Sequence, residues 1–341
     1  MRSQRFGIEM EMTGIPRRKA AEVIAAYFDT HEVYDSGTYD AYHVTDGQGR
    51  KWKVVSDASI HPAARDGRSA STLYKVEVVS PICHYEDIET IQELVRKLRR
   101  EGACVNRSCG IHIHVDAAPH SVKTLRNLVN IMVSKEDLLY KALAVDVARE
   151  DHYCQKTDLS FLEELNRKKP KSIENFERMW YHGDSRSFDH YDETRYHALN
   201  LHSVFSKGTI EFRLFNGTMH AGKVKTYIQL SLAISHQALV QKGASHSRTK
   251  STNEKYTFRT WLLRLGMIGE EFQTARKFLL ENLEGNIAWK DPAQAERQKE
   301  RLAAKRMEEA QNMQGIETED APEQESETET QQDEGFSLQM F

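Results

Sequence analysis

Alternating apolar and polar positions recur along the first 290 residues, between longer segments of helical periodicity. Alternate positions share one face of a strand, whereas positions three and four apart share one face of a helix. The alternating runs predict strands at 6–13, 39–44, 51–56, 73–79, 111–115, 198–204 and 209–215. The helical periodicity predicts helices at 16–29, 87–101, 121–143, 172–180, 223–241 and 270–282. Because these elements do not alternate as βαβ units, the pattern favours an α+β fold on a mixed or antiparallel sheet.

The pattern changes near residue 292. Residues 292–314 are charged and have no sustained apolar stripe, which predicts a weakly anchored helix. Residues 317–334 hold nine Asp and Glu and no Lys or Arg, a composition too polar to bury a core. The expected organisation is a folded domain at 1–290, a charged helix at 291–314 and an acidic disordered tail at 315–341.

The charge balance limits the partners of the protein. The chain has 47 Lys and Arg against 51 Asp and Glu, a net charge of -4, so no global positive field attracts nucleic acid or an anionic membrane. No apolar run approaches the roughly 18 residues that cross a bilayer, and the N-terminus lacks the apolar core of a signal peptide. We therefore expect a soluble cytoplasmic protein. Without the nine acidic charges of 317–334 the net charge becomes +5, which suits a phosphorylated or carboxylated small substrate.

Three predicted strands carry ionisable groups on the face opposite their apolar side chains. In 6–13, 111–115 and 209–215, every second residue is apolar and would face the core. The ionisable residues on the other face are Glu9 and Glu11, His112, His114 and Asp116, and Glu211 and Arg213, in the order of the three strands.

A solvated sheet face is the simplest interpretation of each strand alone. Such a face is usually filled with Thr, Lys, Ser and Gln, whereas these faces offer carboxylates and imidazoles. Two carboxylates at positions i and i+2 repel each other unless a positive group lies between them. Carboxylate oxygens with one imidazole suit magnesium or manganese. Taken together, the three strands favour a metal site over a solvated face.

Two further acidic residues stand near strand ends. Glu77 interrupts an otherwise apolar stretch that ends at Pro81, where a charge on an edge strand is the alternative interpretation. Asp57 and Ser59 follow the strand predicted at 51–56 and are also typical of a strand-to-turn junction. Each position therefore stays open between a structural and a chemical role.

Five motifs, GIEME, SDASI, EVVSP, CGIHIHVD and RYHALNLHSVFSKGTIEFRLFNGT, follow one another along residues 6 to about 240. In this order they resemble the amidoligase family of the carboxylate-amine ligase superfamily, which shares its catalytic fold with glutamine synthetase and glutamate-cysteine ligase. The resemblance implies that 1–290 is a catalytic domain. It also implies a mostly antiparallel curved sheet of the glutamine synthetase type, with helices packed on one face.

The resemblance assigns a role to each matching residue. Metal ions would be bound by Glu9, Glu11, Glu77, His112 and Glu211. His114 would lie beside nucleotide or substrate, Arg213 would contact phosphate, and Arg195 and Asn200 would contact substrate or phosphate. Asp57 matches the Asp of the family's Asp-Gly-Ser turn, although Ala58 replaces the glycine here.

The implied reaction is ATP-dependent amide formation between small-molecule or peptide carboxylate and amine substrates. ATP would convert the carboxylate, a poor electrophile, into an acyl phosphate and leave as ADP. Mg2+ (or Mn2+) and Arg213 would supply the positive charge that γ-phosphoryl transfer needs, and Asp57 or Glu77 would take the proton of the amine. The chain has no GxxxxGK[ST] motif, so ATP would bind through metal ions and not through a P-loop.

Three alternatives stay open at this point. Zinc hydrolases also use His-x-His on a strand, so a metal-dependent hydrolase is the first, and ATP dependence would separate it from a ligase. A guanidino kinase, which shares the superfamily's fold, is the second and would form no amide. A non-catalytic binding protein is the third, because the chain holds 15 histidines that can cluster by chance.

Overall fold

The computed structural model describes residues 1–37 and 40–317. The chain divides into two units, residues 1–290 and a second unit that begins at Asp291. Helix α11 (Pro292–Glu317) is the described part of the second unit. It includes residues 315–317, which the sequence pattern assigned to the tail. The rest of the predicted acidic tail, from residue 318 on, lies outside the described residues.

Eight strands form one sheet in the order β2-β3-β4-β5-β1-β6-β8-β7. All pairs of neighbouring strands are antiparallel, which confirms the predicted α+β class. The strands are β1 (Phe6–Met12), β2 (Glu32–Tyr34), β3 (Tyr42–Thr45), β4 (Lys51–Val55), β5 (Val76–Val79), β6 (Gly110–Asp116), β7 (Leu199–Asn200) and β8 (Thr209–Asn216).

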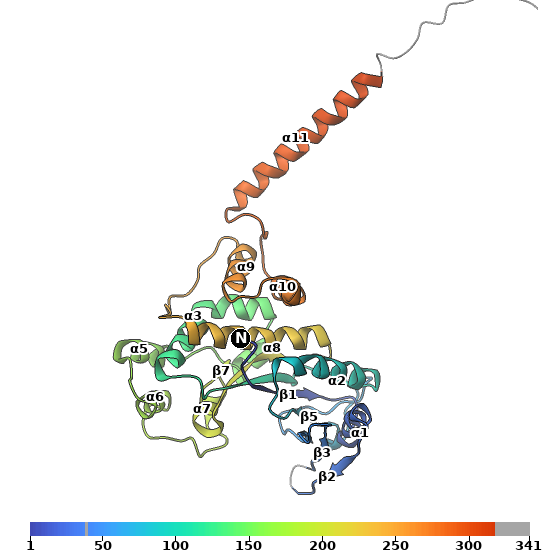
Figure 1. The fold of residues 1–341 in the computed structure, drawn as a ribbon, viewed down its shortest axis with the longest axis vertical. Coiled ribbons are helices and arrows are strands. Elements are labelled where there is room, and N and C mark those ends of the chain that lie inside the picture. Colours follow the sequence, from blue (N-terminus) through green and yellow to red (C-terminus); the bar gives the residue numbers. More distant parts are fainter. Residues whose placement is uncertain (38–39, 318–341) are drawn as a thin grey trace, which may run out of the picture. The chain divides into compact units, whose positions relative to one another are not determined.

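Helices pack against the apolar face of this sheet. The α-helices of the first unit are α1 (Arg17–Phe28), α2 (Ile88–Arg100), α3 (Val122–Leu143), α4 (Val147–His152), α5 (Leu159–Lys168), α6 (Ile173–Trp180), α7 (His202–Lys207), α8 (Ala221–Val240), α9 (Glu254–Arg264) and α10 (Gln273–Leu280). Helices α1, α3 and α8 contact the strands, and α2 packs against both α1 and α8 (Figure 1). None of the helices among the described residues is long and apolar enough to span a bilayer.

Helix α2 illustrates how the pattern produces the packing. Its buried residues are Ile88, Ile91, Leu94, Val95 and Leu98, which share one face of the helix. Burying each of them contributes roughly 1.5–3 kcal/mol. Acidic Glu89 in the first turn and three basic residues in the last turn complement the helix dipole. The side chains of α2 therefore determine both its ends and its buried face.

Two predicted strands are partly wrong. The strand predicted at 198–204 is only β7, because the chain turns into helix α7 at His202. Gly208 ends α7 with a φ of 71°, a left-handed conformation that glycine adopts without a steric penalty. The strand predicted at 73–79 starts at Val76, because Thr72–Tyr74 form a 3-10 turn.

Candidate functional site

Four adjacent strands bring the predicted ionisable residues together on the face opposite the core. Strand β1 lies between β5 and β6, and β8 follows β6. The register pairs Glu11 with Glu77, Glu9 with His112, and His114 with Glu211. Residues far apart in the chain are therefore direct cross-strand neighbours, whose side chains lie close enough to interact.

These side chains form two groups of potential metal ligands. Glu9, His112 and Glu211 each place a ligand atom within 4.8 Å of the other two, and so do Glu11, Glu77 and His112. His112 belongs to both groups. Four carboxylates and one shared imidazole, mostly buried, are the donor set that Mg2+ or Mn2+ prefers. The residues predicted as metal ligands are thus the ones that the fold gathers, and the donor chemistry fits such an ion.

Electrostatic interactions separate the carboxylates into paired and unpaired ones. Burial alone would raise the pKa of Glu9, but the positive field of His114 and hydrogen bonds from His112 and His114 hold the pKa of this carboxyl well below its ordinary value. Burial and the negative charges of Glu9 and Glu11 raise the pKa of Glu77 well above its ordinary value. Glu77 forms no ion pair with any described residue. A divalent cation beside Glu77 would relieve this repulsion.

Glu211 is held from three sides. Burial opposes its ionisation, but Arg213, His114 and His112 lower the pKa of Glu211 to about 2. Arg213 donates to Oε1, and Asn200 Nδ2 donates to Oε2 at 2.6 Å. Burial alone would lower the pKa of His114, but the negative charges of Glu9 and Glu211 raise this pKa above its ordinary value. Glu211 is therefore ionised and fixed in orientation in the folded protein.

A bulge between β6 and β8 adjusts the position of Arg213. Ile113 pairs with Phe212, whereas Ile111 pairs with Phe215, so β8 contains one extra residue at this point. Strict alternation would put Phe215 on the same face as Arg213, but Phe215 stacks on Tyr227 of α8 with 4.4 Å between ring centroids. Bulges of this kind often redirect a side chain next to an active site.

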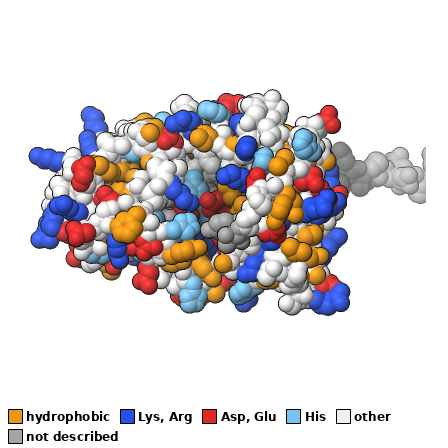
Figure 2. Space-filling model, turned by 90° about the horizontal axis from the view of Figure 1, so that it is seen from below, with side chains coloured by type: hydrophobic (Ala, Val, Ile, Leu, Met, Phe, Trp, Pro, Cys, Tyr) orange, Lys and Arg blue, Asp and Glu red, His pale blue; other side chains and the backbone are white. Residues whose placement is uncertain are grey.

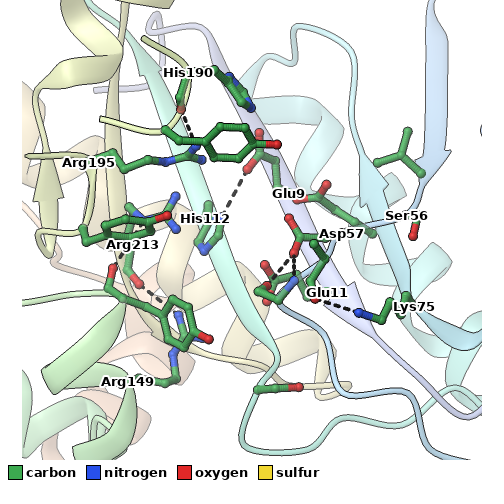
Figure 3. A pocket seen from close by; sticks show the side chains of 18 of the residues that line it. Glu9, Glu11, Ser56, Asp57, Lys75, His112, Arg149, His190, Arg195 and Arg213 are labelled. Carbon is green, nitrogen blue, oxygen red and sulfur yellow. Dashed lines mark hydrogen bonds and ion pairs between the residues drawn. The ribbon is translucent and has the colours of Figure 1, made fainter. Parts of the chain in front are cut away.

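A cavity of about 630 Å³ opens over the clustered residues. In Figure 2, which shows the molecule from below relative to Figure 1, acidic side chains lie at the base of a hollow. Glu9, Glu11 and Asp57 line one side of the cavity, and Arg149, Arg195 and Arg213 line the other (Figure 3). We call the side with Glu9, Glu11 and Asp57 the acidic wall and the side with the three arginines the basic wall. The acidic wall suits cations, and the basic wall suits anions.

Asp57 lies in a turn and also lines the cavity. Its Oδ1 accepts hydrogen bonds from both the N–H and the hydroxyl of Ser59, which is the turn role open to it in the sequence. Lys75 Nζ donates to the carbonyl of Ala58 at 2.7 Å and ties this turn to the residue just before β5. The structural role and the placement in the cavity are therefore compatible.

The remaining predicted residues line this cavity or one of two neighbouring cavities. Arg195 donates to the carbonyl of His190 at 2.6 Å and lines the cavity. Asn200 lies behind Glu211 and lines a neighbouring cavity of about 320 Å³. His114 lines another cavity, of about 310 Å³, at the opposite end of β6 from Gly110. Val79, Pro81 and Ile82 contribute to this more apolar cavity.

Several cavity residues carried no signal in the sequence. Arg149 comes from the short helix α4, and Tyr153 directly follows that helix. Tyr196 and Lys207 also line the cavity, and Lys207 Nζ lies 3.9 Å from Glu9 Oε1. None of these residues belongs to a strand with alternating apolar and polar positions, so this alternation could not reveal them.

The comparison with protein families agrees with this geometry. Residues 2–235 match the family model described as "Putative amidoligase enzyme". This match covers most of the chain, and the chain belongs to this amidoligase family, a class of enzymes that form amide bonds. No curated protein matches the chain.

Proposed function

We propose that this protein is an ATP-dependent carboxylate-amine ligase that forms an amide bond through an acyl phosphate and releases ADP. One observation carries the proposal: in a chain of the amidoligase family, two groups of potential metal ligands share His112, and His112 lines a cavity whose other wall holds three arginines. The substrates are a carboxylate and an amine, each a small molecule or a peptide, and the expected location is cytoplasmic. The geometry suits a reaction that needs metal-bound phosphates beside a second anion.

Glu9, His112 and Glu211 would hold one Mg2+ or Mn2+, and Glu11 and Glu77 would supply carboxylates to a second, because the neutral imidazole of His112 has one free lone pair and ligates one ion. When bound, the ions would neutralise the phosphate charges of ATP and orient the γ-phosphoryl group. The cavity of about 310 Å³ at the His114 end has apolar side chains that suit a nucleotide base. ATP would then lie along β6, with its base near His114 and its phosphates over Glu9.

The chain's own residues would do the rest of the chemistry. Arg213, held by Glu211, would stabilise charge on the transferred phosphoryl group as the carboxylate oxygen takes it from ATP and ADP leaves. Arg195 would contact phosphate or substrate, whereas Asn200 would act through Glu211, whose carboxylate it holds. The amine would then attack the acyl carbon and expel inorganic phosphate, and Asp57 or Glu77 would take its proton.

Product analysis tests this proposal. The protein is incubated with ATP, Mg2+, hydroxylamine and a panel of carboxylic acids, amino acids and short peptides. We expect ADP, phosphate and an acyl hydroxamate with at least one acid, and none of these products without Mg2+. R213K should bind Mg2+ but lose phosphoryl transfer, because an ammonium group cannot reproduce the two-pronged guanidinium contact.

Three results would contradict the proposal. Hydrolysis of a substrate without ATP would identify a metal-dependent hydrolase. A phosphorylated guanidine without amide formation would identify a guanidino kinase. If Mg2+ and Mn2+ neither bind nor support any turnover, the acidic cluster is a structural network in a binding protein.

A further inference from the structure

Arg149 is a buried cation that pairs with no carboxylate in the described part of the chain. Its exposed fraction is 2%, and it forms no ion pair with a carboxylate of the described residues. Nη2 donates to the carbonyl of Arg213 at 3.3 Å, and Nε has no hydrogen-bond partner in the described part of the chain. A buried guanidinium normally pairs with a carboxylate, because an unpaired buried charge is costly.

The fold makes room for this guanidinium on the functional face of the sheet. Gly110 lies on the same face of β6 as His112, and a Cβ atom at Gly110 would come within 2.7 Å of Arg149 Cζ. Glu11 Oε2 accepts the N–H of Gly110 at 2.5 Å, so the acidic wall continues up to this point. The glycine of the Gly-x-His-x-His strand therefore leaves the space that Arg149 occupies.

Aromatic rings support the position of Arg149. Its guanidinium lies 5.9 Å from the ring centroid of Tyr153, and the Tyr153 and Tyr196 centroids are 6.5 Å apart. Arg213 lies 6.0 Å from the Tyr196 ring. Guanidinium groups held against aromatic faces keep a fixed plane and lose water. A fixed, dry guanidinium is suited to bind a carboxylate with two parallel hydrogen bonds.

We infer that Arg149 binds a second, non-reacting carboxylate of the acyl substrate, so that the enzyme activates dicarboxylic acids in preference to monocarboxylic acids. The inference rests on the proposed function. Arg149 lies at the Gly110 end of β6, about 13 Å along the strand from His114, where the proposal puts the nucleotide base. The reacting carboxylate would lie over the metal ligands between these two ends, and the second carboxylate would reach Arg149.

Chain-matched acids test this inference. Glutarate and pentanoate have five carbons each and differ by one carboxylate. In the hydroxylamine assay, the wild-type protein should use glutarate at least about 100-fold more efficiently in kcat/KM, since a buried charge pair forms only with glutarate. R149M should bring the glutarate-to-pentanoate ratio close to one, and R149K should retain part of the preference.

Two further variants separate binding from folding. G110A should displace the end of the Arg149 side chain without removing it, and should therefore also lower the glutarate-to-pentanoate ratio. This variant decides the test if R149M folds poorly. R107M is the matched control, because the Arg107 side chain is 89% exposed and does not line the cavity, so the ratio should stay at the wild-type value.

The possible results have distinct meanings. Equal use of glutarate and pentanoate by the wild-type protein would overturn the inference. A raised KM for ATP in R149M with an unchanged acid ratio would also overturn it and make Arg149 a nucleotide-phosphate ligand. If no acid gives a hydroxamate, the proposed function fails, and calorimetry with glutarate and pentanoate decides the inference alone. Tighter binding of glutarate, lost in R149M, would then support it, and equal binding would overturn it.

Discussion

Asn200 donates its side-chain amide to Glu211 Oε2 at 2.6 Å, across the β7–β8 pair at the edge of the sheet. Both side chains are buried, with exposed fractions of 2% each. Arg213 already occupies Oε1 of the same carboxylate. Asn200 therefore restricts the rotation of Glu211 and fixes which oxygen faces His112. Such hydrogen bonds behind a ligand orient it toward the metal.

N200A should weaken metal binding without removing a ligand. Loss of an orienting hydrogen bond typically lowers metal affinity by about 10- to 100-fold, so the midpoint of a Mn2+ titration followed by thermal shift should rise by that factor. N130A is the control, because Asn130 is equally buried but bonds Asn166 and Ala244 away from the cavity. It should lower the melting temperature and leave the Mn2+ midpoint unchanged. An unchanged midpoint in N200A would show that Arg213 alone orients Glu211.

E211Q should destabilise the metal-free protein. The pKa of Glu211 in the fold, about 2, lies below the ordinary value of 4.5, so the ionised carboxylate stabilises the fold above about pH 4.5. This contribution is lost as the pH falls toward 2, and Gln never has it. At pH 7 in EDTA, E211Q should lose about 2–3 kcal/mol in the free energy of unfolding, measured by urea denaturation, and Mg2+ should stabilise it less than it stabilises the wild-type protein.

The exposed E163Q is a control for E211Q, because it removes the same charge at a surface position and should change neither quantity. If E211Q were as stable as the wild-type protein in EDTA, the Arg213 ion pair would contribute nothing to the fold. If Mg2+ still stabilised E211Q fully, Glu211 would not be a ligand.

E77Q should have the opposite effect on the metal-free protein. The pKa of Glu77 is raised well above 4.5, so ionising this residue costs stability as the pH rises above 4.5. Gln removes that cost, and E77Q in EDTA should be more stable than the wild-type protein at pH 8, by about 1–2 kcal/mol. Metal-induced stabilisation should nevertheless fall, because one donor of the second group is gone. A less stable E77Q in EDTA would mean that Glu77 has a positive partner, contrary to the structure.

Much of the acidic wall could be predicted because it lies on regular strands. The period of two in β1, β6 and β8 places Glu9, His112 and Glu211 on one face without knowledge of the fold. What the period cannot supply is the strand order, which pairs Glu9 with His112 across 103 positions of the chain. The structure supplies that order.

The basic wall was less predictable because it depends on irregular structure. Arg149 belongs to a six-residue helix after a turn at Ala144, where φ is 46°. Its position depends on the gap at Gly110, which a single sequence does not link to residue 149. The strand predicted at 198–204 failed for a related reason, since helix α7 needs Gly208 to reverse the chain and has too few turns to show a helical period.

The last prediction concerns a buried histidine away from the cavity. His120 Nε2 lies 3.0 Å from Ser235 Oγ, which donates to Gln4 Oε1 at 2.6 Å. Ser235 Oγ is therefore the acceptor of the hydrogen bond from His120 Nε2. Burial lowers the pKa of His120 to about 4, against a weaker opposing effect of Asp116. Because the folded pKa is below the ordinary value of 6.5, the unfolded chain binds the extra proton first as the pH falls.

Wild-type protein should therefore lose stability between pH 6.5 and about 4, by at most ~3 kcal/mol from this residue. H120Q keeps an N–H donor for Ser235 but has no titratable group, so its unfolding free energy should depend less on pH over this range. H246Q, at an exposed histidine, should follow the wild-type curve. Urea denaturation at half-unit pH steps measures the difference, and parallel curves for H120Q and wild-type protein would show that His120 is protonated without cost in the fold.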